Sequence, residues 1–345
     1  MRVWMQRSLL APEAFPLAAL IVALVVFATL SPYFLTPSNL SQLVTDNLEV
    51  AIIALAVAPL VIVREIDLSV GSIVGLTAVA FGSSTTAGLP WPVAALLALL
   101  VGVAAGLLNG IIVTRFGLSS IVVTLGSMAL YRGLANVIIA DQTIVGFPEA
   151  FAGWDLRYLP GTVITVAQVI FVVVAIVVAL GLGATTGGRR VYTLGSSPGV
   201  AAATAVRVNR LKVVLFALSG LASGVAGLVL TSRLQSVRAD TGEGLELLVL
   251  TVVLLGGVSI LGGRGSIAGV LVAVVLVGTI RSGMALAGYP DQARIAVIGL
   301  LLLLSIAANV LLRRAQERTR RRRAVQSLTR PLDQETPPRT KAAAP

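Results

Sequence analysis

The stretch WPVAALLALLVGVAAGLLNGIIV, residues 91–113, contains no charged side chain over 23 consecutive positions. A transmembrane α-helix needs about 20 mainly apolar residues to cross a hydrocarbon core roughly 30 Å thick. Within that core a helix satisfies its own backbone hydrogen bonds, which an irregular chain cannot do. This stretch therefore predicts a helix that spans a membrane.

Nine further apolar stretches are spread along the chain. An even number of crossings brings the chain back to the side from which it started, so both termini are expected on one side. The sequence predicts an all-α fold, a polytopic membrane bundle of about ten transmembrane helices. The expected spans are 17–30, 48–63, 70–88, 91–113, 119–139, 162–183, 213–232, 247–261, 267–286 and 294–312.

The composition excludes several other classes of protein. Charged residues make up only 12% of the 345 positions, whereas soluble proteins carry about 25%. Cysteine and histidine are absent, which removes disulfides, thiolate chemistry and the commonest general base. Neither lysine, Lys212 or Lys341, lies in a phosphate-binding loop. We therefore expect no metal, no cofactor and no ATP hydrolysis by this chain alone.

The basic residues predict the orientation of the bundle. The net charge is +11, and with both termini in the cytoplasm 20 of the 26 lysines and arginines fall on the cytoplasmic side. Cytoplasmic loops of membrane proteins carry such an excess. The charge therefore needs no nucleic-acid partner, and it favours cytoplasmic termini in a multi-pass protein of the cell membrane.

The composition changes sharply at residue 312. Residues 313–345 hold ten basic residues, four of them consecutive at 320–323, and four prolines. High charge with few apolar residues is typical of disorder, and basic residues beside a membrane are attracted to anionic lipid. We expect a transmembrane domain over 1–312 and a disordered cytoplasmic tail over 313–345 that contacts membrane lipid.

The expected cytoplasmic loop at about 184–212 is long enough to fold. Ser196 and Ser197 can cap a helix N-terminus, and Pro198 suits the first helical position. The residues that follow are mostly good helix formers. A short helix over about 198–205 is therefore predicted, and it would give a rigid docking face to a cytoplasmic partner.

The segment 64–72 interrupts two apolar stretches and has two interpretations. Asp67 and Ser69 have side chains that cap helix N-termini, so the segment can be a capped turn between helices. Alternatively, it is a break in a discontinuous helix whose polar groups face a transport path. The sequence leaves both interpretations open, including whether the segment is re-entrant.

A few polar side chains lie within or beside the spans, where a charge facing lipid is costly. They either line a path inside the bundle or, for Arg132 and Arg281 near the expected span ends, snorkel to the interface. The candidate residues of the translocation path are Asp67, Ser69, Asn109, Arg132, Asn136, Gln168 and Arg281.

Charged residues also gather in the expected external loops. They form either ordinary solvated surface or a docking surface for a soluble external protein, in which complementary charge sets the register. The candidate docking residues are Glu149, Asp155, Arg157, Arg233, Arg238, Asp240 and Glu243.

Four stretches, in order along the chain, carry a resemblance to a known family. They are IDLSVGS (66–72), TLGSMALYRG (124–133), FALSGLASGVAG (216–227) and VLLGGVSILGGRGS (253–266). With these motifs, the chain from about residue 20 to 312 resembles the permease subunits of ribose-type ATP-binding cassette (ABC) importers.

The resemblance implies a non-catalytic permease subunit that forms the path for a sugar or sugar-like solute. It implies three partners: an ATP-binding subunit that supplies ATP hydrolysis, an external solute-binding protein, and a second permease copy or sister permease. It also places the coupling to the ATP-binding subunit within residues 188–212. The candidate coupling residues are Arg189, Arg190, Pro198, Ala202, Ala203, Arg207, Arg210 and Lys212.

The chain departs from the family's pattern at two places. Arg64 and Glu65 stand where glycines usually precede the IDLS motif, and residues 204–207 replace a Ser-Gly-Ile-Asn-like stretch. Together with residues 147–151, these details resemble the autoinducer-2 and rhamnose branches more than the ribose branch.

Two other functions are weighed against an importer permease. A secondary transporter driven by an ion gradient usually needs carboxylates near the middle of the membrane, and Asp46, Glu49 and Asp67 are expected near helix ends instead. A membrane-embedded enzyme would lack histidine, cysteine and clustered carboxylates inside the bundle. The sequence therefore favours the importer permease.

Overall fold

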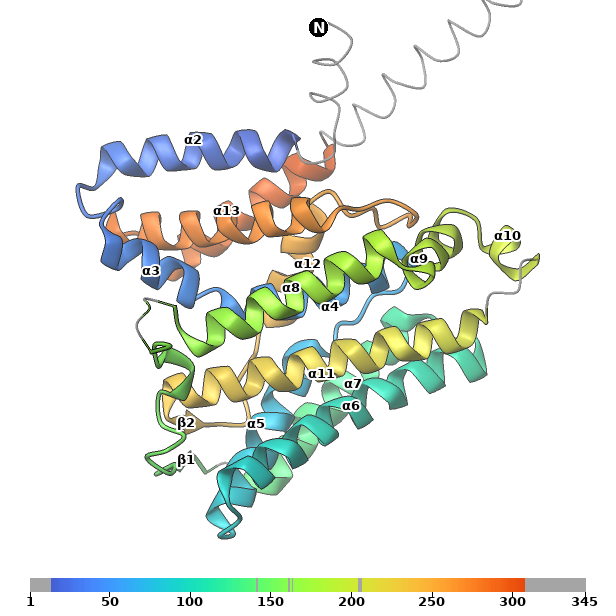
Figure 1. The fold of residues 1–345 in the computed structure, drawn as a ribbon, viewed down its shortest axis with the longest axis horizontal. Coiled ribbons are helices and arrows are strands. Elements are labelled where there is room, and N and C mark those ends of the chain that lie inside the picture. The colour runs from blue at the N-terminus through green and yellow to red at the C-terminus, as the bar shows by residue number, and fades with distance from the viewer. Residues whose placement is uncertain (1–13, 141, 161, 163, 204–206, 308–345) are drawn as a thin grey trace, which may run out of the picture.

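The structure of the protein is a computed structural model that describes residues 14–307, apart from 141, 161, 163 and 204–206. Figure 1 shows long helices stacked side by side and running across the view. The expectation of a helical protein is confirmed, since the strands of the described residues are limited to β1 (Ile144–Val145) and β2 (Ser236–Val237), which pair antiparallel. The tail predicted over 313–345 lies outside the described residues.

The helices coincide with the predicted spans over most of their length. Residues 291–307 are helical as well, and they overlap the predicted last span. The elements with defined bounds are α2 (Ala14–Leu30), α3 (Pro37–Thr45), α4 (Leu48–Ile62), α5 (Val70–Thr86), α6 (Trp91–Phe116), α7 (Ser120–Ile139), the 3-10 helix η1 (Trp154–Leu156), α8 (Val166–Ala184), α9 (Thr186–Ser196), α10 (Pro198–Ala203), α11 (Val208–Leu234), α12 (Leu245–Leu255) and α13 (Ile267–Leu286).

Five helices in the described part of the chain are long and apolar enough to cross a membrane, namely α6, α7, α8, α11 and α13. A sixth span results if α3 and α4, which are bent by 45° relative to each other, count as one. Three predicted spans correspond to shorter apolar helices, α2, α5 and α12. α12 ends at Leu255 rather than near residue 261, because the chain turns at Gly256 and Gly257. The bundle therefore combines complete spans with incomplete ones.

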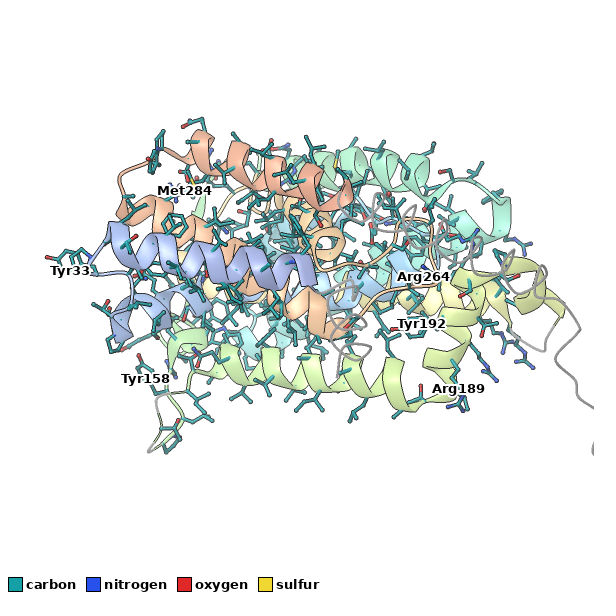
Figure 2. All side chains as sticks on the ribbon, turned by 90° about the horizontal axis from the view of Figure 1, so that it is seen from above. Tyr33, Tyr158, Arg189, Tyr192, Arg264 and Met284 are labelled. Atoms are coloured by element: carbon teal, nitrogen blue, oxygen red, sulfur yellow. The ribbon has the colours of Figure 1, made fainter. Side chains whose placement is uncertain are left out.

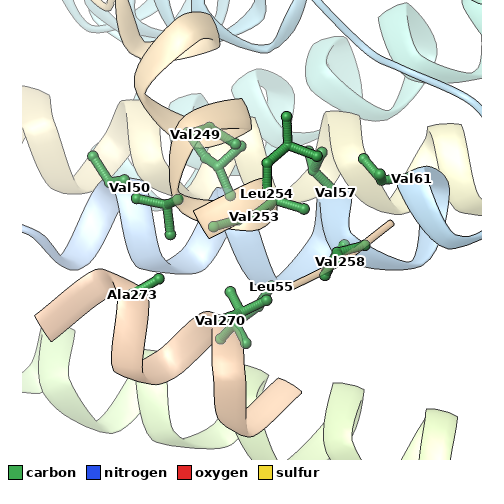
Figure 3. Packing of buried hydrophobic residues seen from close by; sticks show 14 of the residues in the cluster. Val50, Leu55, Val57, Val61, Val249, Val253, Leu254, Val258, Val270 and Ala273 are labelled. Atoms are coloured by element: carbon green, nitrogen blue, oxygen red, sulfur yellow. The ribbon is translucent and has the colours of Figure 1, made fainter. Parts of the chain in front are cut away.

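α4 forms the centre of the bundle, and every residue of it is buried. Figure 3 shows Val50 and Val57 of α4 beside Val249 and Val253 of α12, with Val270 of α13 on the other side. Lipid is as apolar as valine, so in a membrane this packing stabilises the bundle through van der Waals contact. The central helix is thus fixed by α12 and α13, which come from the other end of the sequence.

α6 and α11 pack closely through glycines. Gly102, Gly106 and Gly110 recur every fourth residue on α6, and a Cβ at Gly102 would lie 2.6 Å from the carbonyl oxygen of Gly220 on α11. Small residues at this spacing allow two membrane helices to approach each other closely. The contact holds the two helices that flank the polar site described below.

The bundle has two different ends. β1, β2 and the loop between α7 and α8 lie at one end, which we call the strand end, whereas α9 and α10 lie at the other (Figure 1). Figure 2 shows Tyr33 and Tyr158 at the strand end and Arg189 and Tyr192 at the α9–α10 end. Any path for a solute that connects the two ends must pass between the helices.

Candidate functional site

Between α4 and α5 the chain leaves the helical conformation, and we call residues 64–69 the central segment. Asp67 lies in this segment and is only 3% exposed. Its Oδ1 accepts hydrogen bonds from the Ser69 backbone N–H at 3.0 Å and the Ser69 hydroxyl at 2.6 Å. Its Oδ2 accepts one from the Ser219 hydroxyl of α11 at 2.8 Å. These donors satisfy a carboxylate that the bundle has removed from solvent.

The hydrogen bonds of Asp67 continue into α6 and α7. The Asn109 amide donates to the Ser69 hydroxyl at 2.8 Å, and the Tyr131 hydroxyl contacts the Asn109 amide oxygen at 3.1 Å. All of these side chains are buried. Asp67, Ser69 and Asn109, three predicted path residues, therefore meet in one polar network, which we call the central network.

The first turns of two short helices, α5 and α12, meet beside the central network. A Cβ on Gly71 would lie 2.6 Å from the Gly242 carbonyl oxygen and would clash with the Glu246 carboxylate. From this point α5 runs to the strand end, where Gly82 contacts Ile144 of β1. The loop after α12 instead reaches α9. Transporters use such paired half-helix N-termini to build binding sites, because each N-terminus carries positive partial charge.

Arg132 of α7 holds the chain that leads into α12. Its Nη1 donates to the carbonyl oxygens of Ala239 at 2.6 Å and Thr241 at 3.0 Å. The guanidinium therefore fixes the backbone segment that precedes α12. Beyond this segment, the Glu246 Oε1 accepts from the Gly244 N–H at 3.2 Å, while its Oε2 is buried without a hydrogen-bond partner among the described residues.

A cluster of charged side chains lies nearer the strand end. Arg233 of α11 forms ion pairs with Glu49 and, at 3.6 Å, with Asp46, and it donates to the Thr45 carbonyl oxygen at 2.7 Å. Glu49 is 3% exposed, so the pair with Arg233 is largely protected from solvent screening. Arg233 thereby ties α11 to the bend between α3 and α4.

A cavity of about 340 Å³ opens beside this cluster, between α4, α11, α13 and the start of α12. Arg281 lines it and also lines a second cavity of about 280 Å³ between α3 and α13. Its Nη1 lies 3.5 Å from the Asn47 side-chain oxygen. With carboxylates and guanidinium groups around it, the first cavity offers both acceptors and fork-shaped donors to a polar solute.

The two remaining predicted path residues have different surroundings. Asn136 lies half-buried one turn after Arg132 on α7. The Gln168 side-chain oxygen accepts from the Thr165 N–H at 3.1 Å, and the Thr165 hydroxyl accepts from the Gln168 N–H at 3.3 Å. This capping box at the start of α8 accounts for a polar side chain there without a transport role.

The loop between α7 and α8 folds over the strand end through aromatic contacts. The ring of Phe151 lies 4.3 Å from that of Phe81 and 5.9 Å from that of Trp91, measured between centroids. Phe147 stacks on Phe81 at 5.7 Å. The loop is therefore packed onto α5 and α6.

The predicted docking residues divide into exposed and buried ones. Asp155 is fully buried and accepts from the Ser232 hydroxyl at 2.8 Å, and the Arg233 side chain is 18% exposed. These two hold the strand end together and present little surface to a partner. The exposed members are Glu149, Arg157, Arg238, Asp240 and Glu243.

Asp155 predicts a pH dependence of stability. Burial raises the pKa of Asp155 above its ordinary value, against the lowering effects of the Ser232 hydrogen bond and Arg233. The stability that it contributes is therefore present at low pH and is lost as the pH rises through the folded-state pKa. We expect Asp155→Asn, which is neutral at every pH, to gain a few degrees of melting temperature over the wild type at pH 8 and little at about pH 3.5, below the ordinary pKa of 3.8.

Thermal melts of the detergent-purified protein at both pH values measure this difference. Asp240→Asn is the matched control, because the hydrogen bonds from Arg238 lower the pKa of Asp240 and the substitution cannot gain stability as the pH rises. An Asp155→Asn advantage of the same size at about pH 3.5 and pH 8 would contradict the assignment.

The α9–α10 end contains the predicted short helix and one helix that was not predicted. α10 begins at Pro198 as expected, and residues 204 and 205 of the predicted helix lie outside the described residues. α9 precedes it, capped by the Thr185 hydroxyl, which accepts from the Gly188 N–H at 3.1 Å. The glycines at 187 and 188 concealed this helix from sequence reasoning.

The predicted coupling residues surround α10. Ala202 and Ala203 belong to α10, and Lys212 near the start of α11 forms an ion pair with Glu65. The members with exposed side chains are Arg189, Arg190, Pro198, Arg207 and Arg210. The Tyr192 hydroxyl donates to the Gly265 carbonyl oxygen at 3.0 Å, so α9 is fixed to the loop between α12 and α13.

Comparison with known proteins identifies the class. Residues 39–306 match the family described as branched-chain amino acid transport system / permease component. The chain belongs to this permease family. This permease is also 37% identical over 309 residues to the autoinducer 2 import system permease protein LsrD of Escherichia coli K12 and of Shigella flexneri, which covers 87% of this chain and 92% of each relative. No solved structure matches it.

The family membership confirms the resemblance found in the four motifs. This permease is a non-catalytic, multi-span membrane component of an ABC import system. Sequence reasoning missed Ser219 and Tyr131 as members of the central network, although both lie inside the quoted motifs. It also missed the Glu49–Arg233 pair, for which the signal is a carboxylate at the start of an otherwise apolar helix.

Proposed function

We propose that this permease forms the translocation path of an ABC importer for a sugar-like solute of the autoinducer-2 class. The observation that carries the proposal is the 37% identity to LsrD over nearly the full length of both chains. The charged cavity of about 340 Å³ supports it, because hydroxyl groups of such a solute need both donors and acceptors. Ribose and rhamnose are the alternative solutes of the same class.

We further propose a ten-span topology with both termini in the cytoplasm. The α9–α10 end then faces the cytoplasm and the strand end faces outward, which agrees with the exposed arginines around α10. The transmembrane domain covers 1–312, and the basic tail 313–345 contacts membrane lipid. Asp67, Ser69, Asn109, Arg132 and Arg281 are the residues proposed to shape the path.

The proposed partners follow from the two ends. An ATP-binding subunit docks on α10 and its flanking arginines. An external solute-binding protein docks on the exposed charges at the strand end, where complementary charge sets its orientation. A second copy or sister permease completes the membrane unit, and no nucleic acid takes part.

Purification of the tagged permease from native membranes in mild detergent tests this function. Mass spectrometry should identify an ATP-binding subunit, and the reconstituted complex should take up autoinducer-2 only when ATP and the binding protein are present. Uptake by the permease alone, without ATP, would contradict the proposal and would indicate a secondary transporter.

Ala202→Asp tests the docking of the ATP-binding subunit on α10. A charge placed at the centre of a desolvated contact should weaken the complex by about 2 kcal/mol or more, roughly 30-fold in Kd. Uptake should then be lost while the permease still inserts in the membrane. Ala184→Asp, at an exposed position at the end of α8, is the matched control and should preserve uptake. Normal uptake by Ala202→Asp would remove α10 from the coupling site.

A further inference from the structure

Arg64, the first residue of the central segment, binds the end of α9. Its Nε donates to the Gly195 carbonyl oxygen at 2.8 Å and its Nη2 to the Ser196 carbonyl oxygen at 3.3 Å. Carbonyls in the last turn of a helix have no partner within the helix and carry negative partial charge. The Arg64 guanidinium therefore caps α9 from a different part of the chain.

The backbone of Arg64 has an unusual conformation at the point where its side chain binds α9. Its φ is +69°, a left-handed conformation that residues with a Cβ rarely adopt and that glycine adopts freely. Glycine, which the family's pattern has before the IDLS motif, would adopt this conformation without strain. Here the conformation is held by the bonds to α9 and by the packing of the Arg64 side chain against Gly262.

Glu65, the next residue, binds the start of α11. Its carboxylate forms an ion pair with Lys212, and the residue is only 8% exposed. α9 precedes α10 in the sequence and α11 follows it. Two consecutive residues of the central segment therefore bind the helices on both sides of α10.

The rest of the central segment is bonded to further helices. The Ile66 N–H donates to the Ser120 hydroxyl at 3.1 Å, and the Ile66 carbonyl oxygen accepts from the Thr124 hydroxyl at 3.3 Å, both on α7. Asp67 and Ser69 follow in the central network. Asp67 and the start of α5 follow Arg64 and Glu65 within six residues of the chain. A displacement of Arg64 and Glu65 therefore displaces Asp67 and the start of α5 as well.

We propose that Arg64 and Glu65 are positioning residues that transmit the movement of α10 to the central network during transport. This inference rests on the proposed docking of the ATP-binding subunit on α10. When that subunit moves α10, α9 and the start of α11 move with it. We call the bonds from Arg64 to α9 and the ion pair from Glu65 to Lys212 the two clamps. Through these clamps the moving helices displace the central segment, which alters the contact between the first turns of α5 and α12.

Arg64→Gly tests the transmission in the complete importer, with its ATP-binding subunits and binding protein in proteoliposomes. Glycine adopts the required φ, so the fold and assembly should persist. ATP hydrolysis should continue, while the number of solute molecules taken up per ATP falls by about 2- to 30-fold. A residue with a merely structural role would change the yield and leave this ratio intact. Arg264→Ala, an exposed arginine at the same end, is the control and should keep the wild-type ratio.

The second clamp is tested by charge reversal. Glu65→Lys and Lys212→Glu should each lower the uptake per ATP, and the double variant, which restores the ion pair, should recover it. A wild-type ratio in Arg64→Gly, or no recovery in the double variant, would overturn the inference. Should Arg64→Gly fail to assemble, the recovery of uptake per ATP in the Glu65→Lys, Lys212→Glu double variant is the test of the inference. Failure of the proposed function can be told apart from failure of this inference, because the wild-type complex would then lack ATP-dependent uptake.

Discussion

Replacing Asp67 with alanine should lower the free energy of unfolding by about 3–5 kcal/mol. The change leaves the Ser69 N–H, the Ser69 hydroxyl and the Ser219 hydroxyl without their acceptor in a buried site, and each unsatisfied donor costs about 1–3 kcal/mol. Little folded permease should reach the membrane. Denaturation of the detergent-purified protein and its membrane yield measure the loss.

Asp67→Asn separates the hydrogen bonds from the charge. Its Oδ1 can keep both bonds to Ser69, and its amide N–H can donate to the Ser219 hydroxyl, which turns to accept. We expect this variant to fold and to keep most of the uptake. Asp291→Ala, which removes an exposed ion-pair partner of Arg294, is the control and should cost less than about 1 kcal/mol. A folded but inactive Asp67→Asn would show that transport uses the charge itself.

The position of Asp67 changes the argument against an ion-driven transporter. From the sequence, Asp67 is expected near a helix end, and this expectation is correct for α5. That end, however, lies inside the bundle between α6, α7 and α11. The location of the carboxylate therefore does not exclude ion coupling. The family membership and the similarity to LsrD decide for an importer permease.

The fold could be predicted from the sequence where apolar length alone determines it. Long charge-free stretches such as residues 91–113 mark complete spans, because the membrane sets their length. The same reasoning predicted α5 and α12 as spans over 70–88 and 247–261, but apolar length alone did not show that these two helices are incomplete. Their missing turns are replaced by residues 63–69 and 238–244, which are supported by side chains such as Arg132 from another helix, and hydropathy along the chain does not contain such contacts.

The candidate site, too, could be predicted from the sequence only in part. Asp67, Ser69 and Asn109 could be recognised one by one as polar residues in or beside apolar stretches. Their meeting could not, because the bonds to Ser219 and Asn109 join residues far apart in the sequence. Likewise, the departure from the family's pattern at Arg64 and Glu65 is visible in the sequence, whereas the clamps to α9 and α11 depend on tertiary structure.

Arg233→Ala should be the second strongly destabilising change. It leaves the Glu49 carboxylate, whose side chain is 4% exposed, without its cation, and it removes the donor of the Thr45 carbonyl oxygen. Removal of one partner from a buried ion pair costs about 3–5 kcal/mol, because the remaining charge stays away from water. The connection between α11 and the bend between α3 and α4 should loosen. Denaturant titration of the purified permease measures the effect.

Two further variants distinguish an uncompensated charge from lost packing. Arg233→Met combined with Glu49→Leu removes both charges and keeps apolar volume, so the double variant should recover most of the stability. Arg238→Ala removes an arginine whose pair with Asp240 is more than half exposed on both sides, and it should leave the denaturation midpoint nearly unchanged. If the double variant is as unstable as Arg233→Ala, the loss comes from packing or from the Thr45 bond, and the buried charge is not its cause.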